Sequence, residues 1–362
     1  MIKYRLSQLL TTSIGLSYRV FATLSNRLCS MYQEEGAILV SGAPRSGTTW
    51  LYEILLTLLE YRDVFEPLNP LWSPRWRKIC YSRFELCSIL GTAFRPYLRI
   101  DEEDFKTWKY LDDIFNGKVF TVNAPPTLVT LISKGYSLET RVKDLIKTSK
   151  SILGFPLVKV VRGNRLLPWI MRRFKLRAAY MIIRHPCATI ASQLRTGTGV
   201  PRLSVNELKK MLTYEVLRIE ELSKSVEIVK KLEQISTMIE ALAAIWALDY
   251  YVPLCYQRYG WWHTVVYEKL VLDAKKELKN IFEHIGERIP KEAFIALRRH
   301  SRTAWVRKEF VEDPKEVLSK WKKKLLKEDV ERVLKVLSWF ELNFYGYEIE
   351  PNYKVLKSWS CE

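Results

Sequence analysis

One segment constrains the fold more than any other: a short apolar run, a Gly-containing turn and a helix, in that order. Residues 37–41 predict a buried strand, and the apolar periodicity of residues 48–59 predicts a helix that begins at Thr48. The turn between them reads Gly42-Ala43-Pro44-Arg45-Ser46-Gly47. Glycine lets the backbone turn tightly and point N–H groups at an anion, and a helix N-terminus favours negative charge. The segment therefore predicts an anion-binding loop at the end of a strand.

Strands and helices alternate along the rest of the chain. Further strands are predicted at residues 157–161, at 178–183 and in a run that ends at 264–267, and residues 61–125 predict short helices and loops. Helices are predicted at 165–174, from about Cys187, at 205–250, at 274–285 and at 315–338. This order predicts an α/β protein of the P-loop type, with three layers and a mostly parallel central sheet flanked by helices.

Positive charge is concentrated in one internal stretch. The chain of 362 residues has 58 Lys and Arg against 40 Asp and Glu, a net charge of +18. The 62 residues between Asp144 and Glu207 contain twelve of the basic residues and no acidic one. Because this stretch is partly apolar and internal, it is unlike a disordered basic tail, and it predicts an anionic ligand or partner.

The cysteines and histidines exclude the common metal sites. None of the six Cys forms a Cys-x-x-Cys pair and none of the four His is paired at metal-ligand spacing, so no metal is expected. Reduced thiols are the default expectation, with a Cys80–Cys87 disulfide left open. We accordingly expect a cytoplasmic protein.

The first 30 residues carry apolar side chains at roughly helical spacing among basic ones. They predict a helix packed on the domain, and peripheral contact with a membrane surface is the alternative. The chain has no run of 18 uncharged apolar residues, so a membrane-spanning helix is not expected.

The loop has the glycine spacing of nucleoside triphosphatase loops, but Thr48 stands where those loops need a Lys. The run from Pro44 to Trp50, Pro-Arg-Ser-Gly-Thr-Thr-Trp, instead resembles the 5′-phosphosulfate loop of sulfotransferases. These enzymes use 3′-phosphoadenosine 5′-phosphosulfate (PAPS). By this resemblance, Arg45 is catalytic because it holds the bridging oxygen as charge moves onto the leaving group. The implied cofactor-binding residues of the loop are Arg45, Ser46, Gly47, Thr48 and Thr49.

A second segment matches the same family. Arg184 follows an apolar strand, Pro186 opens a helix, and Ser192 lies two turns into it. This resembles the 3′-phosphate motif of sulfotransferases, Arg-Asp-Pro with a Ser eight residues beyond the Arg, and it implies that Arg184 and Ser192 bind the 3′-phosphate of PAPS. His185 replaces the usual Asp, whose role we interpret as structural.

Sulfuryl transfer to a hydroxyl also needs a group that takes the acceptor proton. The run Val64-Phe65-Glu66-Pro67-Leu68 is similar to a segment of Golgi-type carbohydrate sulfotransferases, and it makes Glu66 the candidate catalytic base. A Glu that caps a helix or pairs with nearby arginines is an equally open alternative. Lys159-Val-Val-Arg162 resembles a strand of the same enzymes, where either cation could steady the transferring group or an anionic acceptor.

Together the motifs predict an N-terminal helical extension (1–35), a sulfotransferase domain (36–348) and a C-terminal tail (349–362). The implied activity is transfer of a sulfuryl group from PAPS to a hydroxyl, with a glycan or glycolipid as the expected acceptor and a small alcohol or a tyrosine left open. No metal and no nucleic-acid partner are expected. Two alternatives stay open. One is a P-loop kinase or NTPase, and the other is a polyanion-binding protein without enzymatic activity.

Overall fold

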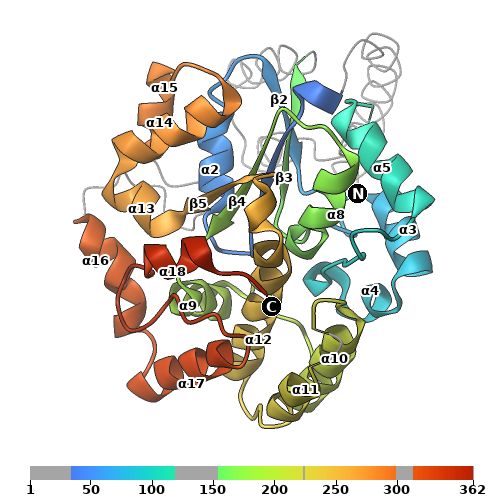
Figure 1. Cartoon of the computed structure of the whole chain (residues 1–362), viewed down its shortest axis with the longest axis vertical. Coiled ribbons are helices and arrows are strands. Elements are labelled where there is room, and N and C mark those ends of the chain that lie inside the picture. The colour runs from blue at the N-terminus through green and yellow to red at the C-terminus, as the bar shows by residue number, and fades with distance from the viewer. Residues whose placement is uncertain (1–33, 119–153, 223–224, 299–312, 362) are drawn as a thin grey trace, which may run out of the picture.

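The computed structural model describes residues 34–118, 154–222, 225–298 and 313–361 (Figure 1). Its centre is a five-stranded sheet in the order β2-β3-β1-β4-β5, and every neighbouring pair of strands is parallel. The strands are β1 (Ile38–Ser41), β2 (Tyr61–Phe65), β3 (Phe155–Val160), β4 (Ala178–Ile183) and β5 (His263–Val266). The predicted α/β class with a parallel central sheet is confirmed.

Helices cover both faces of the sheet (Figure 1). In chain order they are α2 (Thr48–Leu55), α3 (Pro74–Arg83), α4 (Glu85–Leu90), α5 (Phe105–Phe115), α8 (Leu167–Arg173), α9 (Pro186–Thr196), α10 (Val205–Arg218), α11 (Val226–Leu232), α12 (Met238–Cys255), α13 (Tyr267–Leu272), α14 (Ala274–Ile285), α15 (Lys291–Leu297), α16 (Pro314–Ser319), α17 (Lys327–Ser338) and α18 (Tyr353–Ser358). Short 3₁₀ turns are η2 (Glu34–Gly36), η3 (Gly91–Ala93), η4 (Asn164–Leu166), η5 (Gln257–Tyr259) and η6 (Lys320–Lys323).

The strands alternate their side chains between two apolar cores, which gives the molecule three layers. Ile38 and Val40 of β1 point into the core beneath α2, α14 and α15, whereas Leu39 points into the larger core formed with α5, α9, α12 and α17. This period-two alternation follows from strand geometry, and both faces are apolar because helices cover both.

Helix α12 runs through the larger core. Among the described residues, Met238–Tyr259 is the segment long and apolar enough to cross a membrane, yet 83% of its most apolar window is buried inside the molecule. A helix that is apolar all round is expected in the centre of a large domain. We therefore interpret α12 as a core helix, in agreement with the expectation from the sequence.

Sequence patterns located most elements but misplaced some boundaries. The helical periodicity of 205–250 is divided among three helices, because reciprocal capping boxes at Ser204/Glu207 and Thr237/Glu240 begin α10 and α12. Similarly, residues 314–338 form α16, η6 and α17 in place of one helix. Strand β2 lies in the region predicted as helices and loops, since its charged Arg62 and Asp63 interrupt the apolar pattern.

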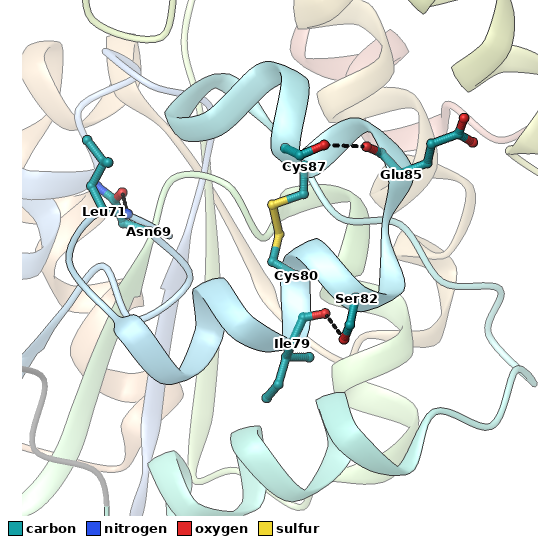
Figure 2. Close-up of a disulfide and its surroundings, with 8 residues drawn as sticks. Asn69, Leu71, Ile79, Cys80, Ser82, Glu85 and Cys87 are labelled. Carbon is teal, nitrogen blue, oxygen red and sulfur yellow. Dashed lines mark hydrogen bonds between the residues drawn. A yellow bond between two sulfur atoms is a disulfide. The ribbon is translucent and has the colours of Figure 1, made fainter.

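Two disulfides correct the expectation of reduced thiols. Cys80–Cys87, the pair that the sequence left open, joins α3 to α4 (Figure 2), and Cys255 at the end of α12 is bonded to Cys361. Within the described residues Cys187 is a free, buried thiol. The spacing of Cys255 and Cys361 along the chain carries no signal that the fold would bring them together.

Residues 349–361 of the predicted C-terminal tail fold back onto the domain. Leu356 of α18 is buried in the larger core, and the Gln257 Nε2 atom donates hydrogen bonds to the carbonyls of Leu356 (3.0 Å) and Trp359 (2.6 Å). Most of the predicted N-terminal extension, residues 1–33, lies outside the described residues.

Candidate functional site

The predicted site residues come from the carboxyl ends of four neighbouring strands. The loop 42–47 follows β1, Arg184 follows β4, Glu66 follows β2, and Lys159 and Arg162 lie at the end of β3. Strand order reverses around β1, the position at which open α/β sheets bind ligands. A cavity of about 570 Å³ lies at this edge. Its lining includes Arg45, Gly47, Thr48, Thr49, Glu66, Arg184 and Ser192.

Ser46 is the predicted site residue that the cavity lining does not include. Its hydroxyl is buried and donates a hydrogen bond to the carbonyl oxygen of Ala43 at 2.7 Å. This bond closes the turn, so the side chain of Ser46 shapes the loop from within.

The loop needs glycine at two positions. Gly47 has φ 98°, and a Cβ atom there would lie 2.5 Å from the Tyr267 ring. A Cβ on Gly42 would lie 2.6 Å from the carbonyl oxygen of Ile182 in β4. Arg45 itself adopts φ 72°, a left-handed conformation that costs a non-glycine residue energy and that the surrounding structure has to impose. The loop is therefore packed closely between β4 and α13.

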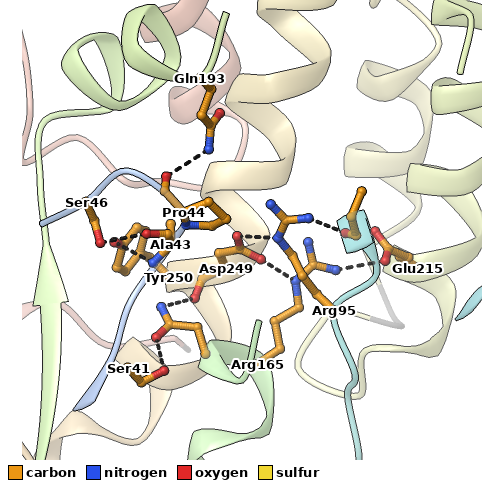
Figure 3. Close-up of polar contacts among 12 residues, drawn as sticks. Ser41, Ala43, Pro44, Ser46, Arg95, Arg165, Gln193, Glu215, Asp249 and Tyr250 are labelled. Atoms are coloured by element: carbon orange, nitrogen blue, oxygen red, sulfur yellow. Dashed lines mark hydrogen bonds and ion pairs between the residues drawn. The ribbon is translucent and has the colours of Figure 1, made fainter. Parts of the chain in front are cut away.

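Side chains of helices α12 and α9 hold the loop in place (Figure 3). The Tyr250 hydroxyl accepts a hydrogen bond from the Ala43 amide (3.2 Å) and donates one to the Ile182 carbonyl (2.9 Å). Gln193 donates from Nε2 to the Pro44 carbonyl at 3.0 Å. These bonds fix the loop before any ligand binds.

A buried ion network lies next to the side chains that hold the loop (Figure 3). Asp249 of α12 accepts from Arg95 Nε (2.7 Å) and Arg165 Nε (2.8 Å), and Arg165 also pairs with Glu215 at 3.0 Å. Burial alone would lower the pKa of Arg165, but Glu215 and Asp249 raise it above its usual range. Two cations and two carboxylates balance here, so the network is structural.

The cations on the cavity side form a cluster. Arg45 Nε donates to Ser192 Oγ at 3.0 Å, and Arg184 Nη1 donates to the Arg45 carbonyl at 3.1 Å. The Arg184 guanidinium also lies over the Tyr267 ring, 4.2 Å from its centroid, while its Nε is buried without a hydrogen-bond partner in the described ranges. The two predicted phosphate motifs thus meet at one place.

Three further cations belong to this cluster: Arg195 of α9 and Lys320 and Lys324 near η6, all of which line the cavity. Burial, Arg184 and Arg195 lower the pKa of Arg45, and burial with Arg195, Lys320 and Arg184 lowers the pKa of Lys324. Sequence reasoning missed Arg195 because it matches no motif, although it lies in the acid-free stretch.

Glu66 follows β2, and both of its carboxylate oxygens accept hydrogen bonds. It is buried, its φ is 55°, and its Oε1 atom accepts from Lys159 Nζ at 2.6 Å. Its Oε2 atom accepts from Arg162 Nη1 (3.0 Å) and from the Val161 amide (3.3 Å). Glu66 therefore pairs with a nearby arginine, which is the alternative that the sequence left open. Its role as a base stays a prediction.

His185, which stands where the resemblance has an Asp, caps α9. Its Nδ1 accepts from the Cys187 amide at 3.2 Å at the start of α9, and its Nε2 donates to the Gly346 carbonyl at 3.1 Å. The ring stacks on Trp321, with centroids 4.4 Å apart. Burial lowers the pKa of His185 to about 3, so the ring is neutral and structural.

Comparisons with known proteins give structural similarities only. No protein-family model matches the sequence, and no curated protein matches it significantly. The sulfotransferase domain of the Synechococcus PCC 7002 olefin synthase is similar at 17% identity and TM-score 0.38, covering 84% of this chain and 94% of that domain. The sulfotransferase domain from the curacin biosynthetic pathway has 16% identity, TM-score 0.40 and coverages of 84% and 97%. Sulfotransferase STF1 from Mycobacterium tuberculosis H37Rv has 12% identity, TM-score 0.38 and coverages of 86% and 79%.

Proposed function

We propose that this protein transfers a sulfuryl group from PAPS to a hydroxyl acceptor. One observation carries the proposal: Arg45 of the glycine loop is bonded to Ser192 inside a cavity that Arg184, Arg195 and Lys324 also line, and within the described residues none of these four cations forms an ion pair with a carboxylate. Cations this close repel one another, so a ligand with several negative charges relieves the repulsion. PAPS carries such charges at two ends, and the motifs supply two anion sites.

The residues fit the two ends of PAPS. The first amide groups of α2, at Thr48 and Thr49, have no intrahelical partner and suit the 5′-phosphosulfate. Arg184 and Ser192 suit the 3′-phosphate, with Arg195 and Lys324 adding charge. Trp50 and Tyr267 also line the cavity, with their ring centroids 5.4 Å apart.

PAPS supplies the activated sulfuryl group. In the transfer, the acceptor oxygen forms a bond to sulfur, the bond from sulfur to the bridging oxygen breaks, and adenosine 3′,5′-bisphosphate leaves. Arg45 is placed to stabilise the negative charge that develops on the leaving oxygen, because a guanidinium donates hydrogen bonds to oxyanions without losing its own proton. The acceptor proton goes to a base, for which Glu66 is the candidate on the opposite wall.

The rival enzymatic reading is a P-loop kinase or NTPase. Such enzymes neutralise a triphosphate with a loop Lys and a magnesium ion, and Thr48 stands at the position of that Lys. The described residues contain no group of three His, Cys, Asp or Glu that could hold a metal ion. We keep the metal-free reaction as an expectation.

A panel of ligands tests this function by thermal unfolding. Adenosine 3′,5′-bisphosphate without magnesium should raise the Tm, because a ligand at a hundredfold excess over its Kd stabilises the folded state by about 2.7 kcal/mol. The Arg184→Ala variant should lose most of this shift, whereas Lys106→Ala, which removes an exposed charge from α5, should keep it. Stabilisation by ATP with magnesium alone would favour the kinase, and salt-sensitive DNA binding alone would favour the polyanion binder.

The disulfides change our proposal for the compartment. A cytoplasmic location rested on reduced thiols, and two disulfides form in the structure. Disulfides persist in oxidising compartments and are rare in the cytosol. We therefore propose an oxidising compartment for the enzyme. The membrane contact predicted for residues 1–30 lies outside the described residues.

A further inference from the structure

The cavity extends beyond the cation cluster, toward the ends of β2 and β3. The loop and Arg184 occupy the β1–β4 side, where the two anion sites lie. The other half of the lining comes from the segment after β2 and the end of β3. Its members are Phe65, Glu66, Asn69, Leu71, Trp72, Lys159, Val161 and Arg162. An acceptor that meets the sulfuryl group from the side opposite the nucleotide would lie in this half.

Trp72 gives this half an exposed aromatic surface. The residue is 42% exposed and lines the cavity, while the ring of Phe65 behind it is only 4% exposed. The two rings are stacked, with centroids 5.8 Å apart and an interplanar angle of 27°. Lys159 Nζ lies 4.1 Å from the centroid of the Phe65 ring. The indole therefore rests on a rigid backing, and its exposed part contributes to the cavity wall.

The segment that carries Trp72 is held in place by its own hydrogen bonds. Asn69 Oδ1 accepts from the Leu71 amide at 3.1 Å (Figure 2), and the Asn69 carbonyl accepts from the Trp72 amide at 3.0 Å. The Ser73 hydroxyl caps α3 by accepting from the Trp76 amide. A ring on a segment fixed this way loses little conformational entropy when a ligand covers it.

We infer that Trp72 is the platform for the acceptor and that it takes one face of a pyranose ring; this inference rests on the proposed sulfuryl transfer. A pyranose has an apolar face of C–H groups and a rim of hydroxyls. Trp72 and the exposed Leu71 match the face. The Asn69 amide and the ionic group of Glu66 and Arg162 line the same half and match the rim.

Other acceptors fit less well. A phenol needs an enclosed apolar slot that covers both faces of its ring, and a lipid chain needs a longer apolar groove. This half instead places one exposed ring beside an amide, a carboxylate and two cations. A mixed surface of this kind leaves hydroxyl groups hydrogen-bonded while it covers a single apolar face.

Binding of methyl glycosides to the protein loaded with adenosine 3′,5′-bisphosphate tests the inference without turnover. The probes are the methyl β-glycosides of glucose, galactose, N-acetylglucosamine and glucuronic acid, with p-nitrophenol and octanol as the competing chemistries. At least one glycoside should bind the wild type, and Trp72→Ala should weaken it roughly tenfold, since one aromatic contact contributes about that much. Trp72→Phe, which keeps a ring, should recover most of the affinity.

The control is Phe105→Ala, which removes a more exposed ring on α5 that is not part of the cavity lining and should change no affinity. Each Trp72 variant should bind adenosine 3′,5′-bisphosphate within twofold of the wild type. Equal glycoside affinity of Trp72→Ala and wild type would overturn the platform, as would binding of p-nitrophenol or octanol without any glycoside. Absence of all acceptor binding to the nucleotide-loaded wild type would overturn it too. Failure of the wild type to bind the nucleotide contradicts the proposed function itself.

Discussion

At the scale of single residues, Glu66 presents the sharpest question about mechanism. Its two oxygens accept hydrogen bonds from Lys159, Arg162 and the Val161 amide, and its backbone adopts a left-handed conformation. A base has to exchange one of these bonds for the acceptor hydroxyl. A positioning residue would instead keep them and hold Lys159 and Arg162 at the cavity wall. The two roles predict different effects of the Glu66→Gln substitution on turnover.

We predict that Glu66→Gln abolishes turnover while nucleotide affinity stays nearly unchanged. Loss of a general base lowers the rate by about 10²–10⁴-fold. The variant also leaves buried Lys159 and Arg162 without their carboxylate, which destabilises the fold by about 3–5 kcal/mol. Single-turnover rates, nucleotide Kd and Tm should therefore be measured together.

The double variant Glu66→Gln/Lys159→Met separates the two roles. Removing both partners of the Glu66–Lys159 pair recovers only part of the stability, since Arg162 stays buried without its carboxylate. A base at Glu66 predicts that the recovered protein still lacks turnover. Near-normal turnover of either variant would refute the assignment and leave Glu66 as a positioning residue.

At the scale of elements, the sequence predicted the parts of the site that are local. The loop after β1 and the start of α9 each combine an apolar strand, a turn and a helix within about fifteen residues, so their patterns are readable. Strand β2 was missed because Arg62 and Asp63 break its apolar run, although the fold buries Arg62. Lys324 joins Arg195 and Arg184 only through packing of η6 near α9, a contact that no local pattern encodes.

The disulfide between α3 and α4 fixes the helix that follows the segment carrying Trp72. Helix α3 begins directly after Ser73, and Cys80 and Cys87 join it to α4 with a separation of seven residues. We predict that Cys80→Ser/Cys87→Ser lowers stability by roughly 2–3 kcal/mol, because the bond restricts the unfolded chain and closes a short loop. Thermal unfolding of variant and wild type without a reductant measures this change. With a reductant both also lose the Cys255–Cys361 bond, and the difference between them should vanish.

The control is Cys187→Ser at the free thiol, which should not change the response to the reductant. Alkylation of the denatured, unreduced protein followed by peptide mass analysis should label Cys187 and spare Cys80 and Cys87. Labelling of all three would contradict the disulfide and, with it, the proposed oxidising compartment.

At the scale of the whole molecule, the basic residues of the acid-free stretch from 145 to 206 have two uses. Some make structural contacts, and others face the proposed anion site. Arg165 is neutralised inside the ion network under the loop, and Arg173 donates to the carbonyls of Ile100 and Glu102. Arg184 and Arg195 instead face the cavity. Only part of the charge surplus therefore serves the anion site. A count of charges along the sequence does not separate the two uses, because the difference depends on which carboxylates the fold brings near.

Glu268 links the stability of the whole molecule to pH. It is buried and accepts from the His185 amide (2.8 Å) and the Tyr345 hydroxyl (3.0 Å). Burial raises the pKa of Glu268 to about 7, from 4.5 in the unfolded chain. The folded state then binds the proton more tightly than the unfolded state, so this contribution to stability is complete below pH 4.5 and is lost as pH rises to about 7. The depressed pKa of His185 acts in the opposite direction, since its contribution is lost as pH falls below 6.5.

Comparison of the wild type with Glu268→Gln isolates the first contribution, because Gln resembles the protonated carboxyl and keeps His185 in place. We predict that the stability of the wild type relative to this variant falls by about 3 kcal/mol between pH 4.5 and pH 8, the value of a shift of roughly 2.5 pKa units. Denaturant unfolding across this range measures the difference, with the exposed Glu283→Gln as a control that should show no such trend. A constant difference between wild type and Glu268→Gln would mean that folding does not raise the pKa of Glu268, so that the group is ionised near neutral pH. In that case the carboxylate would lie permanently near Arg184, and the positive potential of the anion site would not change with pH near neutrality.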